Sequence, residues 1–187
     1  MSEADASGGA TLPDDRPGTY VLLFALGEDR RASAGALGPI DLEAGFYTYV
    51  GSALGPGGVR ARIGRHVRGS GRPHWHVDSL RAVAAVSEVW FRHDPGRREC
   101  GWTAALREIP GFAEEVPGFG ASDCGCRSHL LRFARRPGPN ELSLRLGEGG
   151  EEGTGPLRVA AVRRVELAAQ PPASSGGASS PSTRTRK

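Results

Sequence analysis

Residues 45–67 read GFYTYVGSALGPGGVRARIGRHV, in which a strand pattern, a turn and a helix pattern follow one another directly. Successive side chains of a strand face opposite sides of its sheet, so Tyr47 and Tyr49 are expected together on one side. The next residues, 51–58, contain four glycines and a proline, a composition typical of a turn. This stretch therefore predicts a strand that turns sharply into a helix.

The helix pattern carries an apolar stripe and a separate polar pair. Val59, Ile63 and Val67 recur at every fourth position, which predicts a helix from Val59 to about Val67 with this stripe facing the core. Arg62 and His66 are also four residues apart, so they share another face of the same helix and point the same way.

Other apolar runs predict the remaining elements of a mixed α/β or α+β domain. We expect strands at 20–26, 86–91 and 130–133, helices at about 75–84 and 98–108, and a short hairpin in the polar stretch before residue 45.

Composition shifts divide the chain into four parts. Residues 1–16 lack periodicity and are predicted to be disordered, residues 17–136 form the domain, and 170–187 is a Pro/Ser/Gly-rich tail. The extension between them, 137–169, is predicted to be partly ordered. It holds a short strand in NELSLRL, and a strand or short helix in LRVAAVRRVEL.

The bulk composition excludes several classes of protein. With 38% apolar and 24% charged residues the chain can form an ordinary core. It has no apolar segment of a secretory signal and no run near the roughly 18 apolar residues that a membrane span needs. Three cysteines are too few and too clustered for a disulfide framework. We therefore expect a cytoplasmic protein without a membrane partner, and assign no oligomeric state.

Positive charge is concentrated on the predicted helix 59–67 and just beyond it. The arginines there, with no acidic residue among them, are Arg60, Arg62, Arg65, Arg68 and Arg72. Such a stripe is the expected footprint of a protein that binds phosphate, with Arg60, Arg65 and Arg68 as nucleic-acid contacts. For a charge run taken alone, a solvated helix face is the more common explanation.

Several short motifs occur in a fixed order along the chain. Gly18-Thr19-Tyr20 opens the first strand, Tyr49-Val50-Gly51 ends the second, and the Arg62/His66 pair follows. Further motifs are HWHVDSL at 74–80, the Glu99–Cys100 pair, and GFGASDCGCRSHL at 118–130. Together they resemble the Uri-like branch of the GIY-YIG endonuclease family over about residues 18–133.

The resemblance implies a small antiparallel sheet of three strands flanked by helices, and metal-dependent hydrolysis of phosphodiester bonds, in DNA rather than RNA. The residues that match the family's catalytic positions are Tyr20, Tyr49, Arg62, His66 and, as the further histidine, His76. Glu99 matches the single acidic metal ligand. Thr19 departs mildly from the first motif, and the larger spacing between the two tyrosine motifs implies an insertion near 30–42.

The chemistry of these side chains agrees with such roles. Glu99 offers the hard oxygen ligand that Mg²⁺ or Mn²⁺ prefers, and Arg62 offers a planar, permanently charged fork for phosphate. Either tyrosine is a base only if a nearby cation lowers its pKa, and His66 can relay a proton near neutral pH. Taken singly, each residue is more often a packing residue or solvated surface than a catalyst. Their joint order supports catalysis.

The last motif contains Cys124, Cys126 and His129, with Cys100 at a distance in the sequence. These are zinc ligands by type, but the one-residue spacing of the two cysteines lies outside the usual range. We therefore prefer the interpretation that this segment braces the domain or borders the active site, and keep a Zn²⁺ site as the alternative.

Three functions compete on this basis. The first is a metal-dependent endonuclease, the second a nucleic-acid-binding module that keeps the fold without turnover, and the third a zinc-binding interaction protein. The carboxylate of Glu99 favours the first, because a binding module needs the arginines alone. No separate DNA-reading motif is visible, which favours weak or structure-based selectivity.

Overall fold

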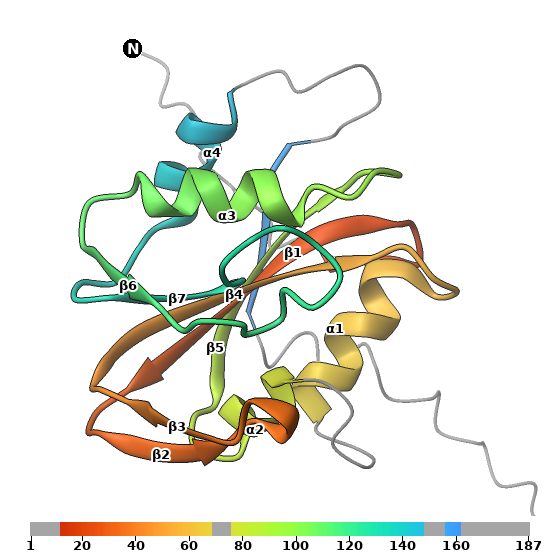
Figure 1. Cartoon of the computed structure of the whole chain (residues 1–187). Helices are drawn as coiled ribbons and strands as arrows, with labels where there is room; N and C mark the ends of the chain where they lie inside the picture. Colours follow the sequence, from red (N-terminus) through yellow and green to blue (C-terminus); the bar gives the residue numbers. More distant parts are fainter. Residues whose placement is uncertain (1–11, 69–75, 148–155, 162–187) are drawn as a thin grey trace, which may run out of the picture.

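The chain folds around a twisted antiparallel sheet (Figure 1), and the structure, a computed structural model, describes residues 12–68, 76–147 and 156–161. Within these residues the main sheet has six strands in the order β6-β7-β4-β1-β5-β8. The strands are β1 (Gly18–Leu26), β4 (Gly45–Ala53), β5 (Val86–His93), β6 (Phe112–Glu115), β7 (Leu130–Phe133) and β8 (Arg158–Ala161).

Helices cover both faces of this sheet (Figure 1). On one face lie α1 (Gly58–Arg68) and α2 (His76–Arg81), and on the other lie α3 (Glu99–Arg107) and α4 (Pro139–Leu146). A separate hairpin of β2 (Arg30–Ser33) and β3 (Pro39–Leu42), joined through the short 3-10 helix η1 (Gly35–Leu37), lies near α2. The fold is therefore the predicted mixed α+β class.

Strand β1 is the centre of the sheet and is buried on both faces. Tyr20 and Leu22 face the α1 side, whereas Val21 and Leu23 face the α3 side. All four side chains are at most 2% exposed. An almost continuous apolar run is what a strand covered on both faces requires. The same alternation holds in β4, where Tyr47 and Tyr49 share the α1 side as expected.

Helix α1 begins where the chain's N-terminal segment lies against it. The backbone N–H of Val59 donates to the Arg16 carbonyl at 3.0 Å, and that of Arg60 donates to the Asp14 carbonyl at 2.8 Å. These bonds satisfy donors that a first turn leaves open. Residues 12–16 thus contact the domain, while 1–11 and 170–187, the rest of the segments predicted to be disordered, lie outside the described residues.

Two predictions about the sheet and its extension were wrong. The three expected strands are present as β4-β1-β5, but their outer edges are paired with β7 and β8, and β6 extends the sheet beyond β7. Residues 139–146 form a helix, not a strand. Pro139 suits the first helical position, Glu141 accepts a bond from the Gly138 N–H at 2.8 Å, and Leu142 is buried against the α3 side.

The hairpin, the strand at 130–133 and the strand option for LRVAAVRRVEL are confirmed by β2–β3, β7 and β8. In the described part of the chain, no helix combines the length and the apolar character that crossing a bilayer demands.

Candidate active site

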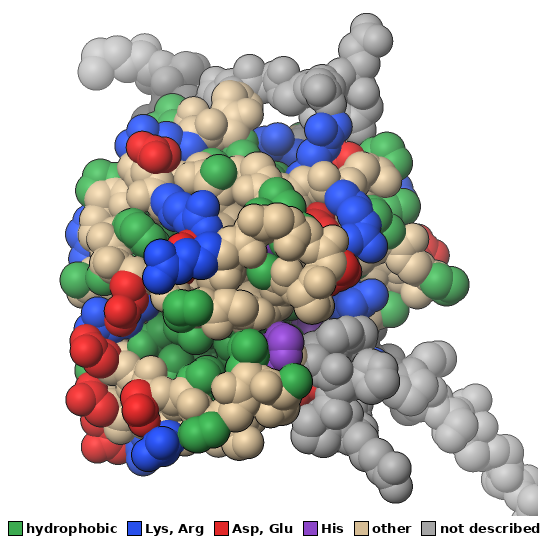
Figure 2. Space-filling model, in the orientation of Figure 1, with side chains coloured by type: hydrophobic (Ala, Val, Ile, Leu, Met, Phe, Trp, Pro, Cys, Tyr) green, Lys and Arg blue, Asp and Glu red, His purple; other side chains and the backbone are tan. Residues whose placement is uncertain are grey.

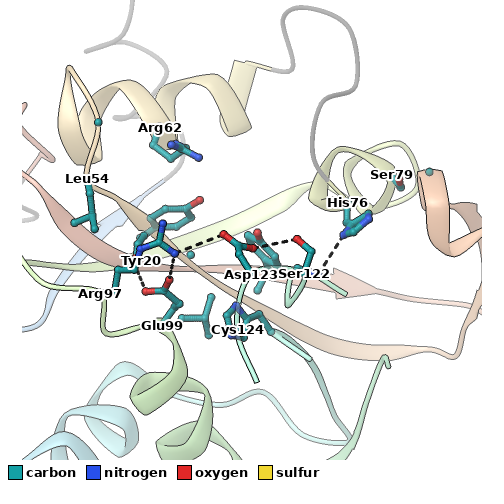
Figure 3. Close-up of a pocket in the computed structure, with 18 of the residues that line it drawn as sticks. Tyr20, Leu54, Arg62, His76, Ser79, Arg97, Glu99, Ser122, Asp123 and Cys124 are labelled. Carbon is teal, nitrogen blue, oxygen red and sulfur yellow. Dashed lines mark hydrogen bonds and ion pairs between the residues drawn. The ribbon is translucent and has the colours of Figure 1, made fainter. Parts of the chain in front are cut away.

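A cavity of about 1040 Å³ opens between the α1 side of the sheet and the start of α3 (Figure 3). Five of the six predicted catalytic and metal-binding residues line it: Tyr20, Tyr49, Arg62, His76 and Glu99. They come from β1, β4, α1, α2 and α3, respectively. The fold therefore brings together side chains that lie up to 79 positions apart in the sequence.

The Tyr20 ring occupies space that a glycine leaves open on the neighbouring strand. Tyr20 of β1 is paired directly with Gly51 of β4. A Cβ atom placed on Gly51 would lie 2.5 Å from the Tyr20 hydroxyl oxygen and 2.7 Å from its ring carbon Cζ. The glycine of the Tyr49-Val50-Gly51 motif is thus required by the tyrosine of the first motif, because any larger residue would displace its ring.

The Tyr20 hydroxyl contacts His66, which lies behind the cavity wall. A hydrogen bond of 2.9 Å joins the hydroxyl to Nε2 of His66, and Nδ1 of the same ring faces Oδ1 of Asp78 at 3.9 Å. A carboxylate at Nδ1 favours the tautomer that carries its proton there, which leaves Nε2 to accept from Tyr20. Tyr20 and His66 are therefore joined by a hydrogen bond along which a proton can move, with the Asp78 carboxylate near the far side of the imidazole.

Burial governs how these groups titrate. Desolvation raises the pKa of Tyr20 well above its usual value and that of Tyr49 to about 12, which outweighs the lowering effect of Arg62. It lowers the pKa of His66 to about 3, against a smaller opposing effect of Asp78. The protein alone thus keeps both tyrosines protonated and His66 neutral, so Arg62 by itself does not produce the expected tyrosine base.

Tyr49 borders the same space through ring contacts. Its ring lies edge-on to His66 at 6.5 Å between centroids and edge-on to Phe119 at 6.0 Å. Gly120 packs against it, since an added Cβ would lie 2.8 Å from the Tyr49 ring, and its φ of +70° also favours glycine. Tyr49 and the 118–130 motif are therefore fitted to each other.

The arginines predicted to bind nucleic acid have different surroundings. Arg62 lines the main cavity, and Arg65 lines with it a smaller adjacent cavity of about 180 Å³. Arg60 lies elsewhere on α1 and faces Asp15 at 3.6 Å. Arg68 is the exposed last residue of α1. Arg72, at the end of the basic stripe, lies outside the described residues.

Glu99 begins α3 and turns its carboxylate to the cavity (Figure 3). It is only 9% exposed and accepts a hydrogen bond from the Ser52 hydroxyl. Nη1 of Arg97 lies 3.6 Å from Oε1 of Glu99 and 3.5 Å from Oδ2 of Asp123, so Arg97 links the two carboxylates across the cavity wall. A hydrogen bond from Ser122 lowers the pKa of Asp123. The carboxylates thus supply hard oxygen ligands at one edge.

His76 is held in one orientation by the backbone. The Gly120 N–H donates to Nδ1 of His76 at 3.2 Å, and the imidazole lies 5.6 Å from the Phe119 ring. Because Nδ1 is an acceptor here, the neutral ring carries its proton on Nε2. His76 therefore lines the cavity with a donor available for an oxygen atom.

A second group of side chains lies beside Glu99, and we call it the Cys/His cluster. Its ligand atoms all lie within 4.8 Å of one another, and they belong to Cys100, Cys124, Cys126 and His129. These four residues could hold a metal ion. The fold brings Cys100 to the other three residues although it is distant in the sequence, and so completes a four-residue group that the spacing of Cys124 and Cys126 had argued against.

Comparison with known proteins places the chain in a family. Residues 19–149 match the family described as "Domain of unknown function DUF123". The chain belongs to the DUF123 family. No curated protein and no solved structure matches it. The matched residues include β1 from Thr19 onward, β4, α1 and α3, so this DUF123 domain contains every residue that lines the candidate site.

Sequence reasoning missed several residues of the DUF123 site. Ser52 and Arg97 contact Glu99, and Asp78 lies behind His66. Asp123, which Arg97 also contacts, belongs to the segment that was expected to brace the domain or border the active site, and it does line the cavity. Each is a common surface residue type, and only proximity in the fold separates it from its neighbours. Asp78 lies in the motif at 74–80 and Asp123 in the motif at 118–130, and these positions were the signal in the sequence that pointed to the site.

The close fit between Tyr20 and Gly51 predicts that one methyl group added at position 51 lowers the stability of the domain markedly. Gly51→Ala should destabilise the domain by about 1–3 kcal/mol through overpacking, measured by urea unfolding. The control is Gly55→Ala in the same cavity wall, where an added Cβ meets nothing within 4 Å. Tyr20→Leu should relieve most of the cost of Gly51→Ala. Equal stability of the two alanine variants would contradict this account.

Burial of neutral His66 predicts a pH-dependent stability. Its pKa is about 3 in the folded chain, against the ordinary 6.5 when unfolded, so the unfolded state binds the extra proton first. Stability should be highest above pH 6.5 and fall towards pH 3, at up to about 1.4 kcal/mol per pH unit from this group. His66→Gln should show a shallower fall in urea unfolding. An unchanged slope would mean that His66 is not buried as described.

Proposed function

We propose that this DUF123 domain is a metal-dependent endonuclease of the GIY-YIG type, Uri-like branch, that hydrolyses phosphodiester bonds, in DNA rather than RNA. The observation that carries the proposal is the convergence of Glu99, Arg62 and the Tyr20–His66 pair on one cavity. We place the enzyme in the cytoplasm, where its three free thiols would stay reduced.

Glu99 and its surroundings suit a hard divalent cation. A bound Mg²⁺ or Mn²⁺ would supply an activated water and neutralise charge on the phosphate. Such an ion keeps several waters and is commonly held by one or two carboxylates together with substrate phosphate. Glu99 fits this pattern, because Ser52 orients its carboxylate at the wall of an open cavity and Asp123 lies near.

Arg62 is the group best suited to bind the scissile phosphate. It reaches the cavity from α1, opposite Glu99 (Figure 3). A guanidinium presents paired donors to phosphate oxygens and remains charged throughout, so it stabilises negative charge that develops in the transition state. His76, with its Nε2 proton, is placed to donate to an oxygen of the substrate.

Tyr20 and His66 are proposed to move the proton of the attacking water. A free tyrosinate is disfavoured by burial, so we assign a coupled transfer, in which Tyr20 accepts a proton as it passes its own to Nε2 of His66. The carboxylate of Asp78 and the negative phosphate both favour the cationic ring that results. This assigns the relay to Tyr20 and a wall position to Tyr49.

Nucleic acid would be bound by a few arginines near the cavity. Acidic and basic side chains are interspersed on the face drawn in Figure 2, and the chain's formal charge is only +3. Affinity would therefore depend on local phosphate contacts from Arg62, Arg65 and Arg68.

The proposal predicts that cleavage depends on Glu99 and Arg62. Labelled single- and double-stranded DNA and RNA are incubated with the protein in Mg²⁺, Mn²⁺ or EDTA. Glu99→Gln and Arg62→Lys should each slow cleavage by about 10²–10³-fold or more, because each removes a group that stabilises the transition state. The controls are two exposed positions, Glu108→Gln at the C-cap of α3 and Arg145→Lys on α4.

Cleavage that survives both substitutions would overturn the proposal. Binding of nucleic acid without cleavage under any metal condition would favour the non-catalytic binding module.

A second prediction concerns the salt dependence of DNA binding by the Glu99→Gln protein. Arg65→Ala should flatten the plot of log K against log salt by about 0.9, the value for one lost phosphate contact. Arg60→Ala should change it less, because Arg60 lies away from both cavities and faces Asp15. Fluorescence anisotropy at several salt concentrations measures both. A larger effect from Arg60 would place the DNA on another face.

A further inference from the structure

The Cys/His cluster combines segments that are remote in the sequence. Cys100 is the second residue of α3, whereas the other three members follow one another between β6 and β7. Sγ of Cys124 lies 3.5 Å from Nε2 of His129, and Sγ of Cys100 lies 3.9 Å from the same nitrogen. Three thiols and an imidazole thus converge on one point.

These separations match a tetrahedral zinc ion. Zinc–sulfur bonds of about 2.3 Å and zinc–nitrogen bonds of about 2.0–2.1 Å place ligand atoms roughly 3.6–3.8 Å apart at the corners of a tetrahedron. The separations of Cys124 and Cys100 from His129, 3.5 and 3.9 Å, lie close to these values, and every separation in the cluster is within 4.8 Å. Small rotations about the cysteine side chains would bring every ligand into bonding distance.

The backbone holds His129 firmly and supports the cluster. His129 is 4% exposed, its N–H donates to the Phe119 carbonyl at 2.8 Å, and its carbonyl accepts from the Val50 N–H at 3.0 Å. Its ring is therefore positioned by β4 and by the loop that carries the cysteines. A preformed ligand of this kind lowers the cost of closing a metal site.

We propose that the Cys/His cluster is a structural zinc centre that ties the loop 120–129 to the first turn of α3. Three thiolates and one imidazole are a soft, closed ligand set, which leaves no open position for a substrate and so favours a structural role over a catalytic one.

This centre would determine the shape of the cavity wall. Glu99 precedes Cys100 in the chain, and Asp123 precedes Cys124. The two carboxylates that Arg97 links are thus each adjacent to a zinc ligand. Zinc binding would hold them at a constant separation. It would also keep Gly120 against Tyr49 and His76, its neighbours in the wall.

The zinc centre does not depend on the proposed nuclease activity, because its ligands are separate from Tyr20, Arg62 and His66. Its first test is therefore a metal measurement. The full chain, purified under reducing conditions, should contain about one zinc per molecule by mass spectrometry, as a single closed four-ligand site requires. Replacement by Co²⁺ should give the intense thiolate charge-transfer and ligand-field bands of a tetrahedral site.

Single substitutions identify the ligands. Cys126→Ser should weaken zinc binding by more than about 100-fold, the upper end of what loss of an outer-shell partner costs. Gly125→Ala is the matched control, because it lies between the two cysteines and its added Cβ meets nothing within 4 Å. That variant should retain zinc and the cobalt spectrum.

A last experiment tests whether the bound zinc also holds the loop and the first turn of α3 in place. Zinc removal by a chelator should speed amide hydrogen exchange in residues 99–103 and 118–130 while β1 stays protected. The inference is overturned if the wild-type chain carries no zinc and its three cysteines titrate as free thiols or as a disulfide. It is also overturned if Cys126→Ser binds zinc as tightly as Gly125→Ala. If Cys126→Ser does not fold, the cobalt spectrum of the wild type decides.

Discussion

The Tyr20 ring lies across Gly51, its partner on the neighbouring strand, and much of the candidate site depends on this contact. It places the Tyr20 hydroxyl within 2.9 Å of His66 on α1 and keeps both groups out of water. Burial then has an electrostatic consequence, because it disfavours charge on Tyr20 and on His66 alike. A site that holds neutral acid and base groups in contact is ready to move a proton once a charged substrate enters.

The edge of the cavity around Glu99 is made of charged groups, in contrast to the neutral Tyr20 and His66. Charged groups compensate one another there, with Arg97 between the carboxylates of Glu99 and Asp123. The start of α3 carries this edge, and the proposed zinc centre would attach it to the loop that bears Asp123. The two sides of the cavity thus differ in chemistry, since one suits proton transfer and the other suits cation binding. Hydrolysis of a phosphodiester needs both.

Local patterns in the sequence were sufficient to predict the elements at the centre of the fold. A continuous apolar run predicted β1, and period-two and period-four repeats predicted β4, β5 and α1, because burial on known faces determines those positions. They predicted β7 and offered β8 as one of two options, but they missed β6. They also could not predict how these strands pair, because that depends on edges that only the folded sheet presents. The sequence patterns also predicted a strand at residues 139–146, where capping by Glu141 and burial of Leu142 stabilise a helix instead. Element boundaries and short elements follow from tertiary contacts.

The residues of the candidate site also divide into those that sequence patterns predicted and those that only the fold reveals. Residues within ordered motifs, such as Tyr20 and Arg62, were predicted and do line the cavity. Ser52 and Arg97 were not, because a serine and an exposed arginine are common and carry no pattern of their own. The Cys/His cluster was undervalued because sequence spacing says nothing about Cys100, which reaches His129 only through the packing of α3. Proximity across the fold is the information that spacing lacks.

The central claim is that the edge of the cavity at Glu99 binds the divalent cation used for phosphodiester hydrolysis. Anomalous diffraction from crystals soaked in Mn²⁺, collected so that manganese and zinc are distinguished, tests this most directly. The account predicts manganese within coordination distance of the Glu99 carboxylate, and no such peak in crystals of Glu99→Gln. Manganese that is absent from this carboxylate, or that occupies the same place in both crystals, would contradict it.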